Sequence, residues 1–368
     1  MSDPTTPTTP TSPHAFPCTG CGARVEYAPG TNVLRCPYCG SQQQVAAVPQ
    51  QVREHPIEDL ARLPRKPVGS LAAHVLVCQQ CGAQTQSNHL ADRCQFCGHP
   101  MVVDNAAIEQ IIPEAVLPFA VDANGVRVAL RRWVSSRWFA PGSLKKVTAA
   151  ERLRGTYLPH WTFDSRTASN YRGQRGDYYY VTETYTVVVD GRTETRTRQV
   201  RKTRWRPASG TTRRDFDDVL VVATGQVPTA HLEALEPWPL KQAAPYQPAY
   251  LAGYQALRYD TEPETGLATA KSRMERVILS DCRRDIGGDE QRIHSVNTRY
   301  FDVTFKLMLL PVWIACYLHA GKSFQVLVNG TTGEVHGERP YSVGKIVLAV
   351  IAALIVVAAV VGLVMYAK

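Results

Sequence analysis

The chain alternates between short cysteine-bearing segments, long strand-like runs and one uninterrupted apolar stretch. Segments 18–40 and 71–104 place apolar residues around turn sequences, which predicts small β-hairpins. Between residues 110 and 340, helix-like stretches alternate with runs rich in Val, Thr and Tyr, so we expect an α+β fold with two small N-terminal modules. Residues 1–17 are rich in Pro and Thr and residues 41–70 in Gln and Pro, which is typical of a disordered tail and a linker.

The C-terminal residues 346–367 contain no charged side chain. As a helix, these 22 residues would span about 33 Å, close to the ~30 Å hydrocarbon core of a bilayer. The alternative is a helix buried in a globular domain, which is rarely apolar on every face. We therefore expect a transmembrane helix. Residues 1–17 have no apolar signal-peptide core, and Arg339 and Lys345 flank the membrane-entry side, so we expect a tail-anchored, single-pass protein of the cell membrane, with most of the chain in the cytoplasm.

Eight of the ten cysteines form two sets with the spacing of metal ligands. The first set reads C-x2-C-x14-C-x2-C and the second C-x2-C-x12-C-x2-C, and a glycine follows every C-x2-C pair. Four thiolates with no open coordination position favour a structural Zn²⁺ site in each of two zinc ribbons. The alternatives are a redox motif, which lacks its βαβ context here, and an iron–sulfur cluster, which usually has other spacings. The predicted zinc ligands are Cys18, Cys21, Cys36, Cys39, Cys78, Cys81, Cys94 and Cys97.

The stretch 178–206 is the most informative part of the long central region. Asp190-Gly191 is typical of a two-residue hairpin turn, and the flanking runs are typical strands. Pairing outward from the turn gives one face that alternates tyrosines with cations and another that carries paired threonines. Neither face is apolar enough for a core, so we expect a long hairpin that projects into solvent. The predicted pairs are Val189 with Arg192, Val187 with Glu194, Tyr185 with Arg196, Glu183 with Arg198, Val181 with Val200 and Tyr179 with Lys202.

Basic charge is concentrated around this hairpin. The whole chain carries 41 Lys and Arg against 32 Asp and Glu, and residues 122–214 alone carry 20 basic against 7 acidic side chains. A basic, aromatic strand face is suited to anionic lipid or to nucleic acid. A third interpretation is a solvated hairpin whose charges only keep an exposed edge from aggregating. The residues that would contact an anionic surface are Tyr179, Tyr185, Arg192, Arg196, Arg198, Lys202 and Arg204.

The tetrapeptides at 158–161 and 310–313 both read Leu-Pro-x-Trp, and each follows a helix-like stretch. This repetition indicates an internal duplication of the α+β domain, with chance similarity of two buried strands as the alternative.

No catalytic constellation is found in the sequence. Gly321-Lys322-Ser323 resembles the end of a P-loop, but the first glycine of that motif would fall on Cys316. Cys316 and Cys282, the two cysteines outside the predicted metal sites, have no recognisable base partner. We therefore expect a protein without enzymatic activity.

Four C-x-x-C-G motifs, the segments LPHWTFD at 158–164 and YRGQRGDYYY at 171–180, and the run VNGTTGEVHGERPYS before the terminal apolar stretch resemble a bacterial family. Its members are tail-anchored double-zinc-ribbon membrane proteins, often labelled after primosomal protein N′ (replication factor Y, a superfamily II helicase) or after transcription-factor-IIB-type zinc ribbons. The resemblance implies zinc binding and a membrane location. It does not extend to helicase activity, because the chain lacks a P-loop and an acidic box.

These features together predict a membrane-anchored interaction or scaffold protein that binds zinc and performs no catalysis. Its expected partners are the lipid bilayer and a protein that contacts the zinc ribbons, with anionic lipid or nucleic acid on the basic hairpin. The alternative is a membrane-tethered nucleic-acid-binding protein.

Overall fold

β-Structure dominates the protein. The computed structural model describes residues 16–46, 51–62, 74–77, 84–87, 89–93, 100–102, 111–137, 153–189, 192–319, 322–337 and 343–366. Strand accounts for 46% and helix for 28% of the structure. The α+β class predicted from the sequence is therefore wrong. Predicted helices do form, but three strands of 36, 31 and 30 residues outweigh them.

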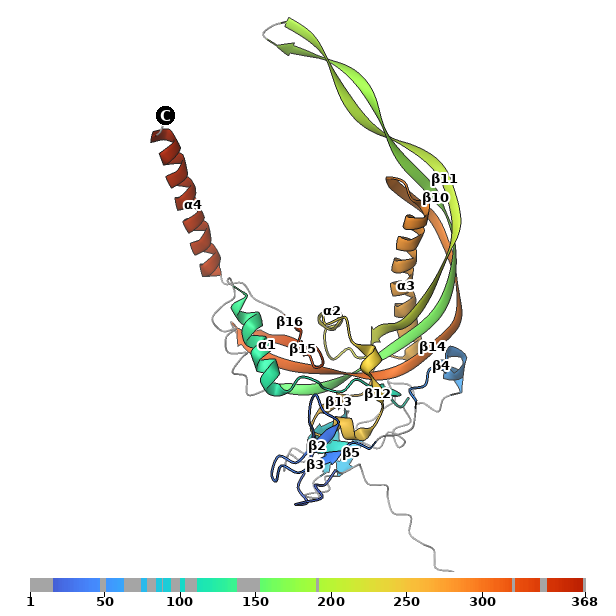
Figure 1. Ribbon diagram of the computed structural model, residues 1–368, viewed down its shortest axis with the longest axis vertical. Helices are drawn as coiled ribbons and strands as arrows, with labels where there is room; N and C mark the ends of the chain where they lie inside the picture. The colour runs from blue at the N-terminus through green and yellow to red at the C-terminus, as the bar shows by residue number, and fades with distance from the viewer. Residues whose placement is uncertain are drawn as a thin grey trace, which may run out of the picture.

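The three long strands form the centre of an 11-stranded sheet. Strand β10 (Arg154–Val189) pairs antiparallel with β14 (Glu290–His319) over its first two thirds and with β11 (Arg192–Val222) from His160 to its end. Strand β15 (Lys322–Asn329) pairs with the last part of β14. Figure 1 shows these strands as one long, strongly curved ribbon.

Short strands extend this sheet and form two small ones. In the large sheet they are β4 (His55–Pro56), β7 (His89–Arg93), β8 (Pro100–Val102), β9 (Ala115–Val116), β12 (Ala244–Pro245), β13 (Gln255–Leu257) and β16 (Val335–Gly337). The small sheets contain β1 (Glu26–Tyr27), β2 (Val33–Arg35) and β3 (Gln42–Gln44), and β5 (His74–Val77) with β6 (Gln84–Ser87).

The α-helices are α1 (Ala123–Ser135), α2 (Thr229–Glu233), α3 (Pro263–Ile286) and α4 (Val343–Tyr366). Helix α3 lies against one face of the three long strands (Figure 1), and its buried residues recur at helical spacing. Those residues are Ala270, Met274, Ile278, Cys282 and Ile286.

Two halves of the chain have the same order of elements, β9-α1-β10-β11 and β13-α3-β14-β15. The first strand of each half pairs in parallel with the long strand of the other, β9 with β14 and β13 with β10. The two Leu-Pro-x-Trp segments lie side by side, with Leu158 directly opposite Leu310. The halves are therefore related by an approximate two-fold axis at this pair, and each half contributes a strand that pairs with the long strand of the other.

The predicted transmembrane helix over 346–367 is contradicted. Among the described residues, none of the helices combines the length and the hydropathy that a bilayer crossing requires. The helix that forms in this region, α4, includes Lys345, and residue 367 lies outside the described residues. An uncharged run favours a helix but does not fix its ends. The tail-anchored topology, the cell-membrane location and the bilayer as a partner were inferred from that span and lose their basis with it.

Candidate metal centre and cationic arm

The first set of cysteines forms a compact cluster that can hold one metal ion. The Sγ atoms of Cys18, Cys21, Cys36 and Cys39 all lie within 4.8 Å of one another. The Cys18–Cys39 and Cys21–Cys36 Sγ pairs are 3.4 and 3.6 Å apart. Four sulfurs at about 2.3 Å from one Zn²⁺ lie roughly 3.8 Å apart in a tetrahedron. The donor set and its spacing therefore fit a four-coordinate zinc site.

Two glycine turns and a hairpin bring these thiols together. Gly22 and Gly40 follow their cysteine pairs with φ values of 68° and 76°, a left-handed conformation that costs glycine little. Each donates its N–H to the carbonyl of the first cysteine of its pair, at 2.8 Å to Cys18 and 3.0 Å to Cys36. Strands β1 and β2 pair between the two turns and set them beside each other.

The Ser41 hydroxyl favours ionised thiols in the cluster. It lies 2.8 Å from the Sγ of Cys18 and 3.1 Å from the Sγ of Cys39. This hydrogen bond lowers the pKa of Cys18 to about 6 and also lowers the pKa of Cys39. The backbone N–H of Ala23 acts in the same direction on Cys21, but the neighbouring thiols outweigh it and raise the pKa of Cys21 to about 12. All four sulfurs can be thiolates together only when a cation compensates their charge.

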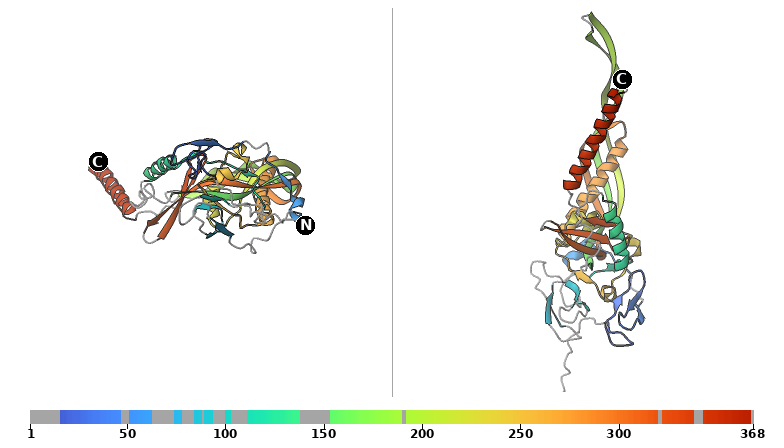
Figure 2. Two further views of the ribbon diagram at one scale, coloured as in Figure 1. Left: turned by 90° about the horizontal axis from the view of Figure 1, so that it is seen from below. Right: turned by 90° about the vertical axis from the view of Figure 1, so that its left-hand side faces the viewer.

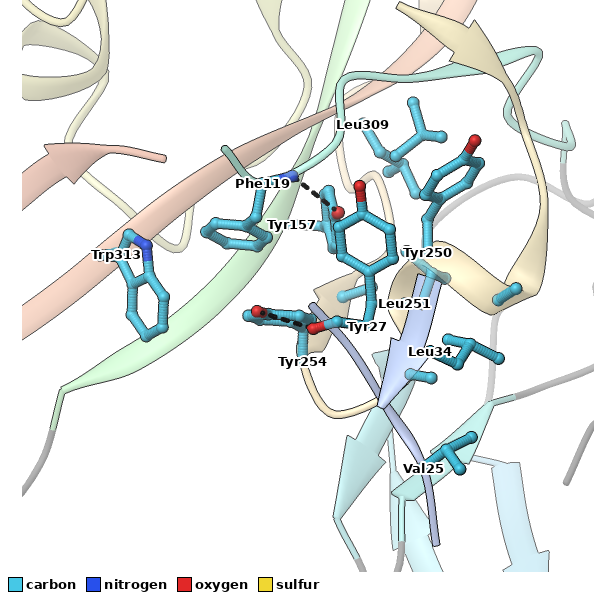
Figure 3. Packing of buried hydrophobic residues seen from close by; sticks show 14 of the residues in the cluster. Val25, Tyr27, Leu34, Phe119, Tyr157, Tyr250, Leu251, Tyr254, Leu309 and Trp313 are labelled. Atoms are coloured by element: carbon cyan, nitrogen blue, oxygen red, sulfur yellow. Dashed lines mark hydrogen bonds between the residues drawn. The ribbon is translucent and has the colours of Figure 1, made fainter. Parts of the chain in front are cut away.

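The cysteine hairpin is part of the main hydrophobic core (Figure 3). Val25, Tyr27 and Leu34 are buried in one cluster with aromatic residues of the large sheet. The Tyr27 N–H donates to the Ala252 carbonyl at 2.9 Å, and the Tyr254 hydroxyl donates to the Tyr27 carbonyl at 3.3 Å. A metal ion at the cysteines would therefore hold one wall of the core in place.

The second predicted set, Cys78, Cys81, Cys94 and Cys97, lies outside the described residues. Strands β5 and β6 end on either side of 78–83, and β7 and β8 on either side of 94–99. A second metal site is not shown.

The predicted hairpin register is confirmed at all six pairs. The turn itself, Asp190-Gly191, lies outside the described residues. The pairing of β10 with β14 ends at Gly176, opposite Glu290, so residues 177–189 and 192–204 continue as a two-stranded ribbon, here called the arm. Figure 2 shows the arm projecting well beyond α3.

All seven candidate residues lie on the side of the β10–β11 ribbon that packs against α3 below the arm. Tyr171 is buried under α3, and its hydroxyl donates to Asp285 at 2.7 Å. No bulge interrupts the β10–β11 pairing between Tyr171 and the tip, so the odd positions of β10 and their even partners on β11 keep this side. We call this side of the arm its cationic face. Its predicted members are Tyr179, Tyr185, Arg192, Arg196, Arg198, Lys202 and Arg204.

The side chains of the cationic face are ordered by ion pairs and ring contacts. Glu183 contacts both Arg198 and Lys202, at 3.4 and 3.2 Å. The guanidinium of Arg198 also lies 5.5 Å from the ring centre of Tyr185, and that of Arg204 lies 5.1 Å from that of Tyr179. Glu183 thus links Arg198 and Lys202, and a tyrosine ring supports each of Arg198 and Arg204.

A cluster of acids around a buried lysine was missed by the sequence analysis. Lys306 is 5% exposed, and its Nζ lies 2.8 Å from Glu54 and 2.5 Å from Asp218. Asp164 adjoins both acids: the Asp218 N–H donates to it at 2.5 Å, and the Thr304 hydroxyl lies 3.2 Å from Asp164 and from Glu54. These residues are far apart in the chain, and only the fold brings them together.

Burial and the nearby Glu54 raise the pKa of Asp164 to about 7. The hydrogen bond with Asp164 and the contact with Lys306 lower the pKa of Glu54 to about 2. The two carboxyl groups therefore share one proton near neutral pH. Although Glu54, Asp164 and Asp218 have the spacing of metal ligands, the Lys306 ammonium already supplies a cation, and we interpret the group as an ion-pair cluster.

The incomplete P-loop motif has no P-loop geometry in the described residues. Lys322 begins β15 and pairs with His319 of β14 in an antiparallel hairpin. A P-loop lies between a strand and a helix whose N-terminus faces the phosphates.

Comparison with known proteins shows one extended similarity. The chain is 24% identical over 351 residues to YdjG, an uncharacterized protein of Bacillus subtilis (strain 168), covering 90% of this chain and 92% of that protein. No protein-family model matches the chain. No solved structure matches it either. The similarity to YdjG extends along nearly the whole chain but assigns no activity.

Proposed function

We propose that this protein is a non-enzymatic interaction protein that uses a structural zinc site to brace its core and presents the arm to a partner. The arm supports this proposal best. Most of its side chains are exposed and none of its residues belongs to the described hydrophobic core, yet it remains an ordered, fully paired ribbon. Ordering the backbone of about thirty residues costs roughly 1–2 kcal/mol of conformational entropy for each residue. Outside the core, no burial of apolar surface offsets this cost.

Zinc at Cys18, Cys21, Cys36 and Cys39 would have a structural role. Four protein sulfurs complete a tetrahedral ligand set and leave no position for a substrate or a reactive water. We expect a second zinc at Cys78, Cys81, Cys94 and Cys97, whose spacing is of the same type. Elemental analysis should therefore find two zinc ions per chain. Cys36→Ser should lower that number by one, and Cys282→Ser, which changes a thiol on the buried face of α3, should leave it unchanged.

Site-specific photo-crosslinking in cells tests the interaction function. A crosslinking amino acid at Tyr185, on the exposed part of the arm, should capture a partner in high yield, whereas one at Ser280, exposed on α3, serves as the matched control. Equal yields at the two positions would remove the support for an interaction arm.

A variant with a shortened arm shows whether the arm is needed for the stability of the fold or only for contact with a partner. Asp177 and Arg204 lie directly opposite each other, so an Asn-Gly turn can replace residues 178–203 without changing the register. This variant should keep its zinc content and should unfold within about 0.5 kcal/mol of the natural chain, because the removed residues are outside the core. A larger loss of stability would show that the arm serves the fold.

A further inference from the structure

We infer that the cationic face of the arm binds the phosphate backbone of double-stranded DNA. This inference rests on the proposed interaction function and names the partner class. It follows from the charge, shape, spacing and ring contacts of the arm, each of which restricts the kind of surface that fits.

The charge of the cationic face favours a polyanion. Seven exposed cations lie on this side of the β10–β11 ribbon, from the Arg175–Arg206 pair just below the arm to the tip, against three acids, Asp177, Glu183 and Glu194. Within the described residues, the ion pairs of these acids leave Arg192, Arg204 and Arg206 without an acidic partner. The opposite face of the arm carries one cation, Arg201. The seven cations are Arg175, Arg192, Arg196, Arg198, Lys202, Arg204 and Arg206.

The curvature of the arm favours a rounded partner. Figure 1 shows the arm curving over the side of the sheet on which α3 lies, with its two strands winding around each other. The cationic face lies on the α3 side at the base of the arm and turns around the axis of the ribbon towards the tip. A winding row of cations can follow the curved backbone of a nucleic-acid duplex, whereas a flat lipid surface would meet only part of it.

The dimensions of the arm match those of B-DNA. Side chains on one face of a strand recur every ~6.8 Å, which equals the axial rise of about two phosphates along one DNA strand. The paired arm from Asp177 to Val189 is about 40 Å long, slightly more than one turn of the duplex at about 34–36 Å. A two-stranded ribbon also fits the width of the major groove, about 12 Å.

The tyrosines of the arm favour a duplex over a single strand. Proteins that bind single strands stack bases on open aromatic rings. On the cationic face, Arg204 lies against Tyr179 and Arg198 against Tyr185, so arginines already occupy these rings. Among the described residues the Arg204 guanidinium has no acidic partner and remains available to a phosphate oxygen, and contacts of this kind depend little on base sequence.

Fluorescence anisotropy of the full-length protein with a mixed-sequence 30-base-pair duplex tests the inference. Affinity should fall between 50 and 200 mM salt with a slope in log K against log salt of about −4, as expected for four to five neutralised phosphates. R192Q/R196Q/R198Q/K202Q should weaken binding at least tenfold at 100 mM salt and make the slope shallower. The matched control, T184Q/T186Q/T195Q/T197Q, changes four residues on the opposite face and should bind within twofold of the natural chain. R204Q/R206Q, near the base of the arm, provides a second and milder loss of charge, and urea midpoints verify that all variants fold.

Several results would overturn the inference. They are equal binding by the cationic-face variant and its control, a salt slope near zero, tighter binding to a single strand or to an RNA duplex of the same length, and binding to vesicles of mixed phosphatidylcholine and phosphatidylserine in the absence of DNA binding. If Tyr185 crosslinks to a protein in cells and the duplex does not bind, the interaction function stands and the DNA inference fails.

Discussion

Leu158 of β10 lies directly opposite Leu310 of β14, and this pair marks the point where the two halves of the sheet meet. Three residues further along each strand, Trp161 and Trp313 occupy equivalent places. Each indole N–H donates to a backbone carbonyl of the other half at 2.9 Å, Trp161 to Thr261 and Trp313 to Val121. The two halves are thus joined by strands of each half that pair with the other and by a reciprocal pair of partly buried hydrogen bonds.

This reciprocity predicts equal costs for two substitutions. Trp161→Phe and Trp313→Phe each remove one indole donor and leave a partly buried carbonyl without it, so each should lower the free energy of unfolding by about 1–3 kcal/mol. The two losses should agree within about 1 kcal/mol. Urea unfolding of the full chain measures them.

Trp205→Phe is the control for this pair. Trp205 lies opposite Gly176 at the base of the arm, where the Arg292 guanidinium packs 3.8 Å from its ring centre, so the substitution should cost at most about 0.5–1 kcal/mol. A negligible effect at only one of the two core tryptophans would contradict the equivalence of the halves.

The hairpin could be predicted residue by residue because its determinants are local. Turn residues at Asp190-Gly191 set the register, and the two-residue period of a strand sets the faces. The same reasoning fails at Asp164, where bulges interrupt the pairing of β10 with both neighbours. Asp218 adds a second irregularity, with a φ of 52°. Alternation along the sequence therefore could not place Asp164 and Asp218 beside Lys306.

The cysteines of the metal-binding cluster could be predicted from the sequence, but the contacts of their hairpin with the core could not. The spacing of Cys18, Cys21, Cys36 and Cys39 indicates a metal site wherever it occurs. The contacts of Tyr27 with Ala252 and Tyr254 depend on a segment far along the chain, which no local pattern encodes. The fold class was wrong for a related reason: the great length of β10, β11 and β14 arises from pairing between distant segments and not from local propensity.

Removing the metal should loosen the contact between the cysteine hairpin and the core. Hydrogen exchange of a peptide covering residues 25–32 should accelerate at least tenfold after chelation, because the Tyr27 and Gly30 amides donate to Ala252 and Phe119 across this contact. A peptide covering residues 166–174, within the three long strands, should be unaffected. Equal acceleration of both peptides would indicate global unfolding, and no change in either would argue against a structural metal.

Lys322→Ala tests the incomplete nucleotide motif. Lys322 lies in an antiparallel hairpin, so phosphate release from ATP or GTP should stay at background in both the natural chain and the variant. Turnover by the natural chain that the substitution abolishes would contradict a non-enzymatic protein.

The Asp164–Glu54 pair predicts a pH-dependent contribution to stability. Burial and Glu54 raise the pKa of Asp164 from 3.8 to about 7, so the folded chain binds a proton that the unfolded chain has released. This contribution is complete below pH 4 and is lost as the pH rises to about 7. The pKa of Glu54 is lowered from 4.5 to about 2, so the titration of Glu54 changes the stability only below about pH 4.5.

Asp164→Asn isolates this contribution, because asparagine resembles the protonated acid at every pH. Between pH 5 and pH 8.5 the variant should gain on the order of 1 kcal/mol of stability relative to the natural chain, after allowance for solvent screening of a partly exposed group. Burial lowers the pKa of His160 to about 4 and gives stability the opposite slope below pH 6.5, but this effect cancels in the difference between the two proteins.

Asp302→Asn is the matched control for this measurement, because Asp302 forms an exposed ion pair with Arg166 outside the cluster. Its difference from the natural chain should be the same at both pH values. If the difference between Asp164→Asn and the natural chain is also the same at pH 5 and pH 8.5, the shared proton does not stabilise the contact of Glu54 with the sheet, and Lys306 alone holds that segment in place.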